Sequence, residues 1–173
     1  MKHTHERRYS LAVRWPAPPL NIALVEPEIP PNTGNIARLC AATGTRLHLV
    51  EPLGFQLTSA HLRRAGLDYW DSVDLSRHAS LQAFHLSQNN PRCFYFSTRA
   101  RRSYTEASYG PGDTLIFGSE SKGLPDKVLE AHEAETFGIP ILTEHVRSLN
   151  LANAVAIVLY EALRQINVRL STP

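Results

Sequence analysis

Three short segments of the chain gather side chains that could do chemistry, and the first lies between Pro30 and Arg38. Its two prolines predict a rigid entry into a helix that Asn32 or Thr33 would cap. Arg38 follows one turn after Gly34. Because a guanidinium stays protonated, Arg38 could stabilise developing negative charge, but it is a poor general base. A surface arginine on a well-capped helix would give the same pattern.

The second segment runs from Ile116 to Pro125 and places two glycines between an apolar strand and a helix. Glycine at the end of a strand lets a ligand approach the backbone closely, so we expect a side chain at Gly118 to intrude on a bound ligand. The segment contains neither the Gly-x-Gly-x-x-Gly fingerprint nor the Gly-Lys-Ser/Thr of a P-loop. A nicotinamide-linked oxidoreductase is therefore disfavoured, and a tight structural turn stays the alternative to a ligand site.

The third segment, residues 147–154, places Ser148 and Asn150 before a long helix. These polar side chains could bind a ligand or only cap the helix. The helix carries apolar residues at helical spacing, and over residues 154–159 it is apolar all round. We therefore expect one side of it to pack on a sheet and a second side, which includes Val158, to be buried against a partner chain.

The elements that must position these segments alternate along the chain between short apolar strands and amphipathic helices. This alternation predicts an α/β domain with a mostly parallel sheet and helices on both of its faces. Ligands of such sheets gather at the carboxyl ends of the strands. The expected strands are residues 21–26, 46–50, 92–97, 114–117 and 135–142, and the expected helices are residues 33–42, 58–65, 80–88, 124–131 and 150–167.

Length and composition are those of one compact globular domain. The chain has 173 residues, of which 43% are hydrophobic and 20% charged. Residues 1–19 are basic and proline-rich and are expected to form a flexible arm, which leaves residues 20–173 for the domain. No apolar run approaches the roughly 20 residues of a membrane span, and no secretory signal opens the chain. We therefore expect a cytoplasmic protein with no membrane partner.

The charged residues are distributed unevenly, although the net charge is only +2. No acidic residue lies between Asp74 and Glu106, a stretch that contains Arg99, Arg101 and Arg102. This arginine cluster favours a surface that binds a polyanion. The two cysteines and eight histidines show no spacing typical of a disulfide framework or a metal site, so we expect no metal.

Taken together and in this order, the three segments resemble the SPOUT superfamily of RNA methyltransferases. Within it they are most similar to the TrmL (YibK-like) branch, which methylates the ribose at the tRNA wobble position. The resemblance spans residues 20–165 and is most specific in residues 26–35, 62–69 and 148–151. Ser119 and Lys122 depart slightly from the family pattern, which has proline and arginine there. The arm lies outside the resemblance.

The resemblance implies a fold and a set of site residues that spacing alone could not show. The C-terminal part of the chain would form a deep trefoil knot, which would hold S-adenosylmethionine. The cofactor residues would be Phe96, Ser97, Gly118, Glu120, Ile139, Ser148 and Leu149. Arg38 and Asn150 would be catalytic, with Arg38 beside the reacting ribose. The residues expected to bind RNA are Arg63, Arg64, Arg99, Lys122 and Tyr160.

The activity implied is S-adenosylmethionine-dependent 2′-O-methylation of cytidine or uridine at tRNA position 34, and we expect leucine tRNAs. The partners would be the tRNA anticodon loop and a second copy of the chain in a homodimer. Methylation of another tRNA or ribosomal RNA site stays an alternative, although ribosomal RNA enzymes usually carry an extra N-terminal domain and 19 residues cannot make one. A non-catalytic RNA-binding module is the second alternative.

Overall fold

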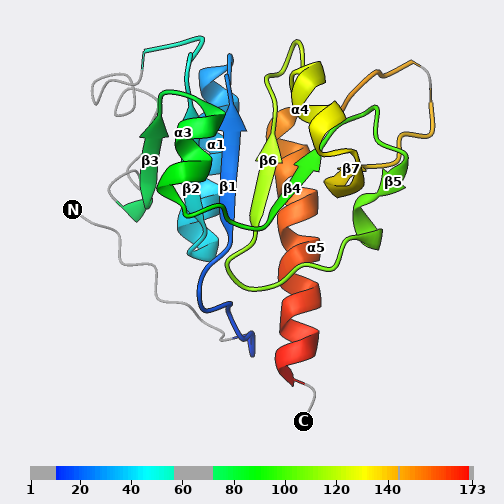
Figure 1. Ribbon diagram of the computed structural model, residues 1–173. Coiled ribbons are helices and arrows are strands. Elements are labelled where there is room, and N and C mark those ends of the chain that lie inside the picture. The colour runs from blue at the N-terminus through cyan, green and yellow to red at the C-terminus, as the bar shows by residue number, and fades with distance from the viewer. Residues whose placement is uncertain (1–10, 57–71, 144, 172–173) are drawn as a thin grey trace.

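The structure of the chain is a computed structural model that describes residues 11–56, 72–143 and 145–171. Its centre is a seven-stranded sheet of order β3-β2-β1-β6-β4-β7-β5, in which every strand pairs parallel to its neighbours (Figure 1). The strands are β1 (Asn21–Val25), β2 (Arg46–Val50), β3 (Leu75–His78), β4 (Cys93–Phe96), β5 (Arg102–Ser103), β6 (Thr114–Phe117) and β7 (Thr136–Gly138).

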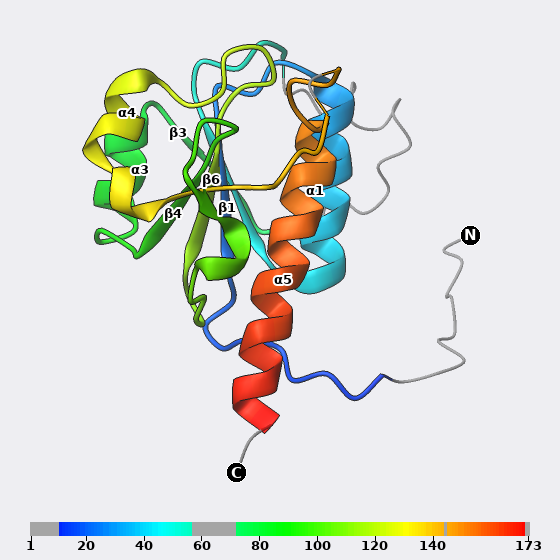
Figure 2. The ribbon, with the colours of Figure 1, turned by 90° about the vertical axis from the view of Figure 1, so that its right-hand side faces the viewer.

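Helices cover both faces of the sheet, as Figure 2 shows. The helices α1 (Pro30–Thr43) and α5 (Leu151–Ser171) lie side by side on one face, and α3 (Leu81–Ser87) and α4 (Asp126–Ala131) lie on the other. Two short 3-10 helices, η2 (Tyr104–Glu106) and η3 (Glu133–Glu135), complete the described elements. The expected α/β architecture is confirmed, and the trefoil knot stays a prediction.

The alternating side chains of the strands divide the core into two layers. Towards α1 and α5, side chains such as Ile22 and Leu47 pack against Ile36 and Val158. Towards α3 and α4, Ala23, Val25, Val50 and Ile116 pack around Phe84 and Leu124. Val158 is fully buried within its own chain. The expectation that Val158 contacts a partner chain is therefore wrong, because its side of α5 faces the sheet.

Several boundaries differ from those expected. The first helix begins at Pro30 rather than Thr33, because prolines at the first two helical positions lack only N–H groups that have no partner there. The last strand ends at Gly138 rather than Leu142, and Pro140 follows, which cannot donate to a sheet ladder. The sequence pattern missed β3 and β5, which are short, polar and at the two edges of the sheet. The expected helix at residues 58–65 lies outside the described residues.

The described part of the N-terminal arm, residues 11–19, runs beside the end of α5 (Figure 2). The backbone N–H of Arg14 donates to Asn167 Oδ1 at 2.9 Å, and the Arg14 guanidinium donates to the carbonyl of Leu170 near the end of the helix. A cation at that position is favourable, because helix C-termini carry partial negative charge. The flexible arm and the domain boundary at residue 20 stay predictions. Within the described ranges, no helix is long and apolar enough to cross a membrane.

Candidate active site

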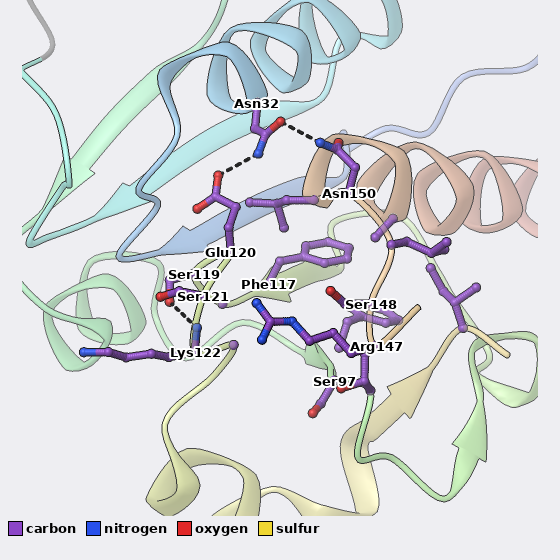
Figure 3. A pocket seen from close by; sticks show the side chains of 18 of the residues that line it. Asn32, Ser97, Phe117, Ser119, Glu120, Ser121, Lys122, Arg147, Ser148 and Asn150 are labelled. Atoms are coloured by element: carbon purple, nitrogen blue, oxygen red, sulfur yellow. Dashed lines mark hydrogen bonds between the residues drawn. The ribbon is translucent and has the colours of Figure 1, made fainter. Parts of the chain in front are cut away.

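A cavity of about 530 Å³ opens at the carboxyl ends of the central strands (Figure 3). The loops that follow β4, β6 and β7 surround it, and the segment before α5 and the first turn of α1 close it. Parallel strands bring these loops to one edge of the sheet, although they lie far apart in the sequence. The cavity is called the donor pocket below. It has the size and the mixed apolar and polar lining of a small-molecule site.

All seven residues expected to bind a cofactor line the donor pocket. They are Phe96, Ser97, Gly118, Glu120, Ile139, Ser148 and Leu149. Asn150, Arg99 and Lys122 line it as well, whereas Arg38 and Tyr160 do not. Arg38 and Tyr160 are instead exposed on α1 and α5, the two neighbouring helices. Arg63 and Arg64 lie outside the described residues.

One asparagine joins two walls of the pocket (Figure 3). The Asn32 amide donates from Nδ2 to Glu120 Oε1 at 2.9 Å, and its Oδ1 accepts from Asn150 Nδ2 at 2.9 Å. Glu120 also accepts from the backbone N–H groups of Glu28, at 2.8 Å, and Ile29, at 3.3 Å. The carboxylate therefore lies beside the N-terminus of α1, where negative charge is favourable.

These bonds correct the expected cap of the first helix. Neither Asn32 nor Thr33 caps α1, because Ile29 is the N-cap residue and its side chain makes no capping bond. Glu120, far away in the sequence, instead accepts from the backbone N–H groups of Glu28 and Ile29, the two residues just before the helix. Sequence reasoning did not place Asn32 in the pocket, where it is nearly buried. The available signal was a polar residue beside two prolines, which is equally typical of a cap.

Asn150 has two structural functions in addition to its place in the pocket. Its Oδ1 accepts from the backbone N–H groups of Ala152, at 2.9 Å, and Asn153, at 3.3 Å, so it caps α5. Its Nδ2 is the group that donates to Asn32. The alternative that this asparagine caps the long helix is thus confirmed, and its catalytic role stays a prediction.

The fold of the loop itself also requires glycine at position 118. A Cβ on Gly118 would lie 2.0 Å from the carbonyl carbon of Gly123 and 2.2 Å from the nitrogen of Leu124. The loop folds back there, with the Gly123 N–H donating to the carbonyl of Ser119 at 2.9 Å. A side chain at Gly118 would therefore collide with the loop itself whether or not a ligand is bound. The expected intrusion on a ligand stays a prediction.

The arginine cluster faces acidic residues rather than open solvent alone. Arg99 Nη2 donates to Asp126 Oδ1 at 2.6 Å, and Arg101 Nη1 lies 3.9 Å from Glu133 Oε1. Arg102 donates to the carbonyl of Ala134 at 2.6 Å. The acids of residues 126–135 thus lie against the basic residues of 99–102. The fold brings together two segments that look in the sequence like separate regions of opposite charge.

A run of buried polar side chains crosses β1, β2 and β3. His48 Nδ1 lies 3.1 Å from His78 Nε2, and His48 Nε2 lies 3.3 Å from Asn21 Oδ1. Burial, with a smaller contribution from the neighbouring His78, lowers the pKa of His48 to about 4. No residue of this run lines the donor pocket, so we assign it to the sheet. Among the residues that the structure describes, no three His, Cys, Asp or Glu side chains are placed to hold a metal ion.

Comparison with known proteins identifies the family of the chain. The profile of the SpoU rRNA Methylase family matches residues 19–160, which contain every donor-pocket residue named above. The chain belongs to the SpoU methylase family.

Relatives in the SpoU family resemble the chain over most of its length. It is 50% identical over 148 residues to the tRNA (cytidine(34)-2′-O)-methyltransferase of Escherichia coli K12, and the match covers 85% of this chain and 94% of the relative. A solved structure concerned with the 2-OH methylation of C/U34 on tRNA has a TM-score of 0.78 and 51% identity, and the match covers 84% of this chain and 95% of that one. An AdoMet-bound rRNA methyltransferase from Sinorhizobium meliloti has a TM-score of 0.73 and 27% identity over 84% of this chain and 56% of its own.

Proposed function

We propose that the chain transfers a methyl group from S-adenosylmethionine to the ribose 2′-oxygen of nucleotide 34 of tRNA, cytidine or uridine, with leucine tRNAs as substrates. The observation that carries this proposal is the 50% identity with the E. coli tRNA (cytidine(34)-2′-O)-methyltransferase, of which the match covers 94%. The described side chains supply a pocket in which such a donor could be held.

The donor pocket fits S-adenosylmethionine in size and in chemistry. Its volume of about 530 Å³ suits a nucleoside with a short chain, and Ile139, Leu149 and Leu151 offer apolar surface for a base. Ser97 and Ser148 add hydroxyl groups. When bound, the cofactor would supply an electrophilic methyl group on a sulfonium. The AdoMet-bound relative from Sinorhizobium meliloti supports this choice of donor.

Methyl transfer to a hydroxyl group depends mainly on the orientation of the nucleophile. Arg38 would position the ribose and its adjacent phosphate and would stabilise the alkoxide as it forms. Arg38 does not line the donor pocket of its own chain. We therefore propose that a second copy of the chain brings its Arg38 to this pocket, in a homodimer formed through α1 and α5.

The exposed face of α5 supports the homodimer. Ile157 is 38% exposed and Tyr160 is 54% exposed, and they are near each other on the helix surface. The neighbouring helix α1 exposes Arg38. An apolar residue beside a tyrosine and an arginine is typical of protein interfaces. Tyr160 and Lys122 would lie where the tRNA reaches the composite site.

The activity is tested by incubating the purified protein with S-adenosylmethionine and leucine tRNA transcripts that carry cytidine, uridine or adenosine at position 34. Mass spectrometry of the digested nucleosides should show 2′-O-methylcytidine or 2′-O-methyluridine from the first two. The adenosine transcript serves as the control. Methylation of ribosomal RNA in place of tRNA, or no methylation of any RNA, would reject the proposed function.

Arg38→Ala tests the proposed role of the arginine. The affinity for S-adenosylhomocysteine, measured by calorimetry, should stay within a few-fold of wild type, because Arg38 does not line the donor pocket. Methyl transfer should fall at least about 100-fold, since an electrostatic contact made in the transition state is lost. A variant that retains more than about a tenth of the wild-type turnover would make Arg38 a surface residue only.

A further inference from the structure

A second cavity, of about 580 Å³, adjoins the donor pocket. It lies between the loop after β4 and the segment that contains α4 and η3. Ser97 and Arg99 line both cavities. The backbone N–H of Arg99 donates to Ser97 Oγ at 3.2 Å, which fixes the loop at the junction. We call this second cavity the arginine groove; the side chains used below are Arg99, Arg101, Arg102, Asp126 and Glu133.

The three arginines of the groove are held to different degrees. Arg102 is fixed, because it donates to the carbonyl of Ala134 and its guanidinium lies 4.5 Å from the centre of the Phe137 ring. Arg99 is 58% exposed and pairs with Asp126, whose side chain is 74% exposed. Arg101 is even more exposed and lies 3.9 Å from Glu133. Exposed ion pairs of this kind contribute little stability, so a stronger anionic ligand could replace either acid.

We propose that the arginine groove binds a phosphodiester of the substrate RNA next to the methylated nucleotide, and that Asp126 holds Arg99 until the phosphate takes its place. This inference rests on the proposed function. The RNA chain that places a ribose in the donor pocket must continue away from the pocket on one side. Arg99 lines both cavities and so lies between the donor pocket and the groove. A guanidinium binds phosphate through two parallel hydrogen bonds, which its single bond to Asp126 does not match.

Asp126 has two effects in this arrangement. It keeps Arg99 in place when no RNA is bound, and it competes with the RNA phosphate for the same guanidinium. Removal of the carboxylate should therefore strengthen RNA binding rather than weaken it. A merely structural acid would have the opposite effect, because its loss would loosen the loop between β4 and β5. The sign of the change in affinity separates the two roles.

The test uses the full chain with Asp126→Asn, Arg99→Gln and the double variant, and a leucine tRNA that the wild type methylates. Asp126→Asn should lower the Kd for tRNA and the KM about two- to fivefold at low salt, with kcat unaltered. Arg99→Gln should raise the Kd and reduce the slope of log Kd against log salt concentration by about 0.7. In the double variant, the loss of Asp126 should bring no gain, because its effect passes through Arg99.

Asp74→Asn is the matched control. Asp74 also pairs with an exposed arginine, Arg46, at 3.0 Å, and Arg46 is the first residue of β2, at the end of the sheet away from the donor pocket. This variant removes the same charge and should leave tRNA affinity within measurement error. Thermal unfolding of each variant checks that it folds.

Three results would overturn the inference. The first is weaker tRNA binding by Asp126→Asn. The second is a gain in tRNA affinity on adding Asp126→Asn to Arg99→Gln that equals the gain in the wild type. The third is a gain in tRNA affinity from Asp74→Asn that equals the gain from Asp126→Asn. If the wild type neither binds nor methylates tRNA, the proposed function fails together with the inference. If the wild type methylates position 34 and the variants at 99 and 126 bind tRNA as it does, only the inference fails.

Discussion

Asn32 connects two walls of the donor pocket through the two ends of one amide group. Its donor end meets the carboxylate of Glu120, and its acceptor end meets the amide of Asn150. Each partner also serves the start of a helix, Glu120 for α1 and Asn150 for α5. Buried polar groups joined in this way depend on one another, because the loss of one leaves the others without a partner.

Asn32→Ala should reduce both stability and donor binding. The free energy of unfolding should fall by about 2 kcal/mol, since Glu120 and Asn150 each lose a hydrogen bond in a partly buried place. Affinity for S-adenosylhomocysteine should fall on the order of tenfold, which is ~1.4 kcal/mol. Urea unfolding and calorimetry measure the two effects. Asn35→Ala, on the exposed side of the same helix, is the control. Unaltered donor affinity in the destabilised variant would make Asn32 a structural residue only.

For single residues, the sequence predicted which side chains line the pocket better than it predicted the hydrogen bonds between them. The seven expected cofactor residues line one cavity because the resemblance carried their positions. Asn32 is hydrogen-bonded to Glu120, which lies 88 positions later in the sequence, and to Asn150, which lies 118 positions later. No local sequence pattern predicts contacts at such separations. Gly118 shows the same limit, since its neighbour in space, the backbone of Gly123, follows from the shape of the loop.

The strands of the sheet differ in how far their sequence reveals them. Strands β1, β2, β4 and β6 are apolar runs that are buried almost throughout, so their composition predicts them. The edge strand β3 reads Leu-Ser-Arg-His and was not predicted, because its polar side chains find partners that only the fold supplies. The imidazole of His78 meets His48 on the next strand and Ser87 on α3.

The burial of His48 makes stability depend on pH. His48 has its pKa lowered to about 4 by burial, against an ordinary value of 6.5, so the unfolded chain binds a proton that the folded chain does not take up between these two values. Stability is therefore complete above about pH 6.5 and falls as the pH falls towards 4. Between pH 7 and pH 5, His48 should contribute a loss of about 2 kcal/mol.

Urea unfolding at the two pH values measures this loss. His48→Asn should unfold with a smaller difference between pH 7 and pH 5, because the titrating group is gone. His145→Asn, at an exposed position before α5, should keep the wild-type difference. If His48→Asn keeps it as well, the acid sensitivity arises elsewhere in the molecule.

The molecule as a whole exposes one face of α5 while the opposite face lies in the core. Val155, Val158, Leu159 and Ala162 are buried, and Ile157 and Tyr160 face outward. The sequence predicted that this helix is apolar on more than one side, but it did not separate the side that packs inside the chain from the side that stays exposed. That separation depends on the rotation of the helix on the sheet, which the core residues on both elements determine together.

Ile157→Asp should therefore convert the proposed homodimer into a monomer, because an unpaired charge in an interface is unfavourable. Light scattering should show the lower mass, and methylation should fall with it if Arg38 acts on the other subunit's pocket. Leu86→Asp, at a position that is 69% exposed on α3 across the sheet, is the matched control. A monomeric Ile157→Asp variant with full activity would contradict the shared site, and a dimeric one would place the interface elsewhere.

The hydrogen bond between Asn32 and Asn150 joins parts of the chain that are synthesised far apart in time. The ribosome makes Asn32 early and Asn150 118 residues later. Until Asn150 has emerged, the donor pocket lacks the wall formed by residues 147–151 and the start of α5. A chain that stops short of α5 would therefore lack both this wall of the donor pocket and the side chains that α5 adds to the core. Synthesis of residues 147–171 therefore precedes any formation of the donor pocket.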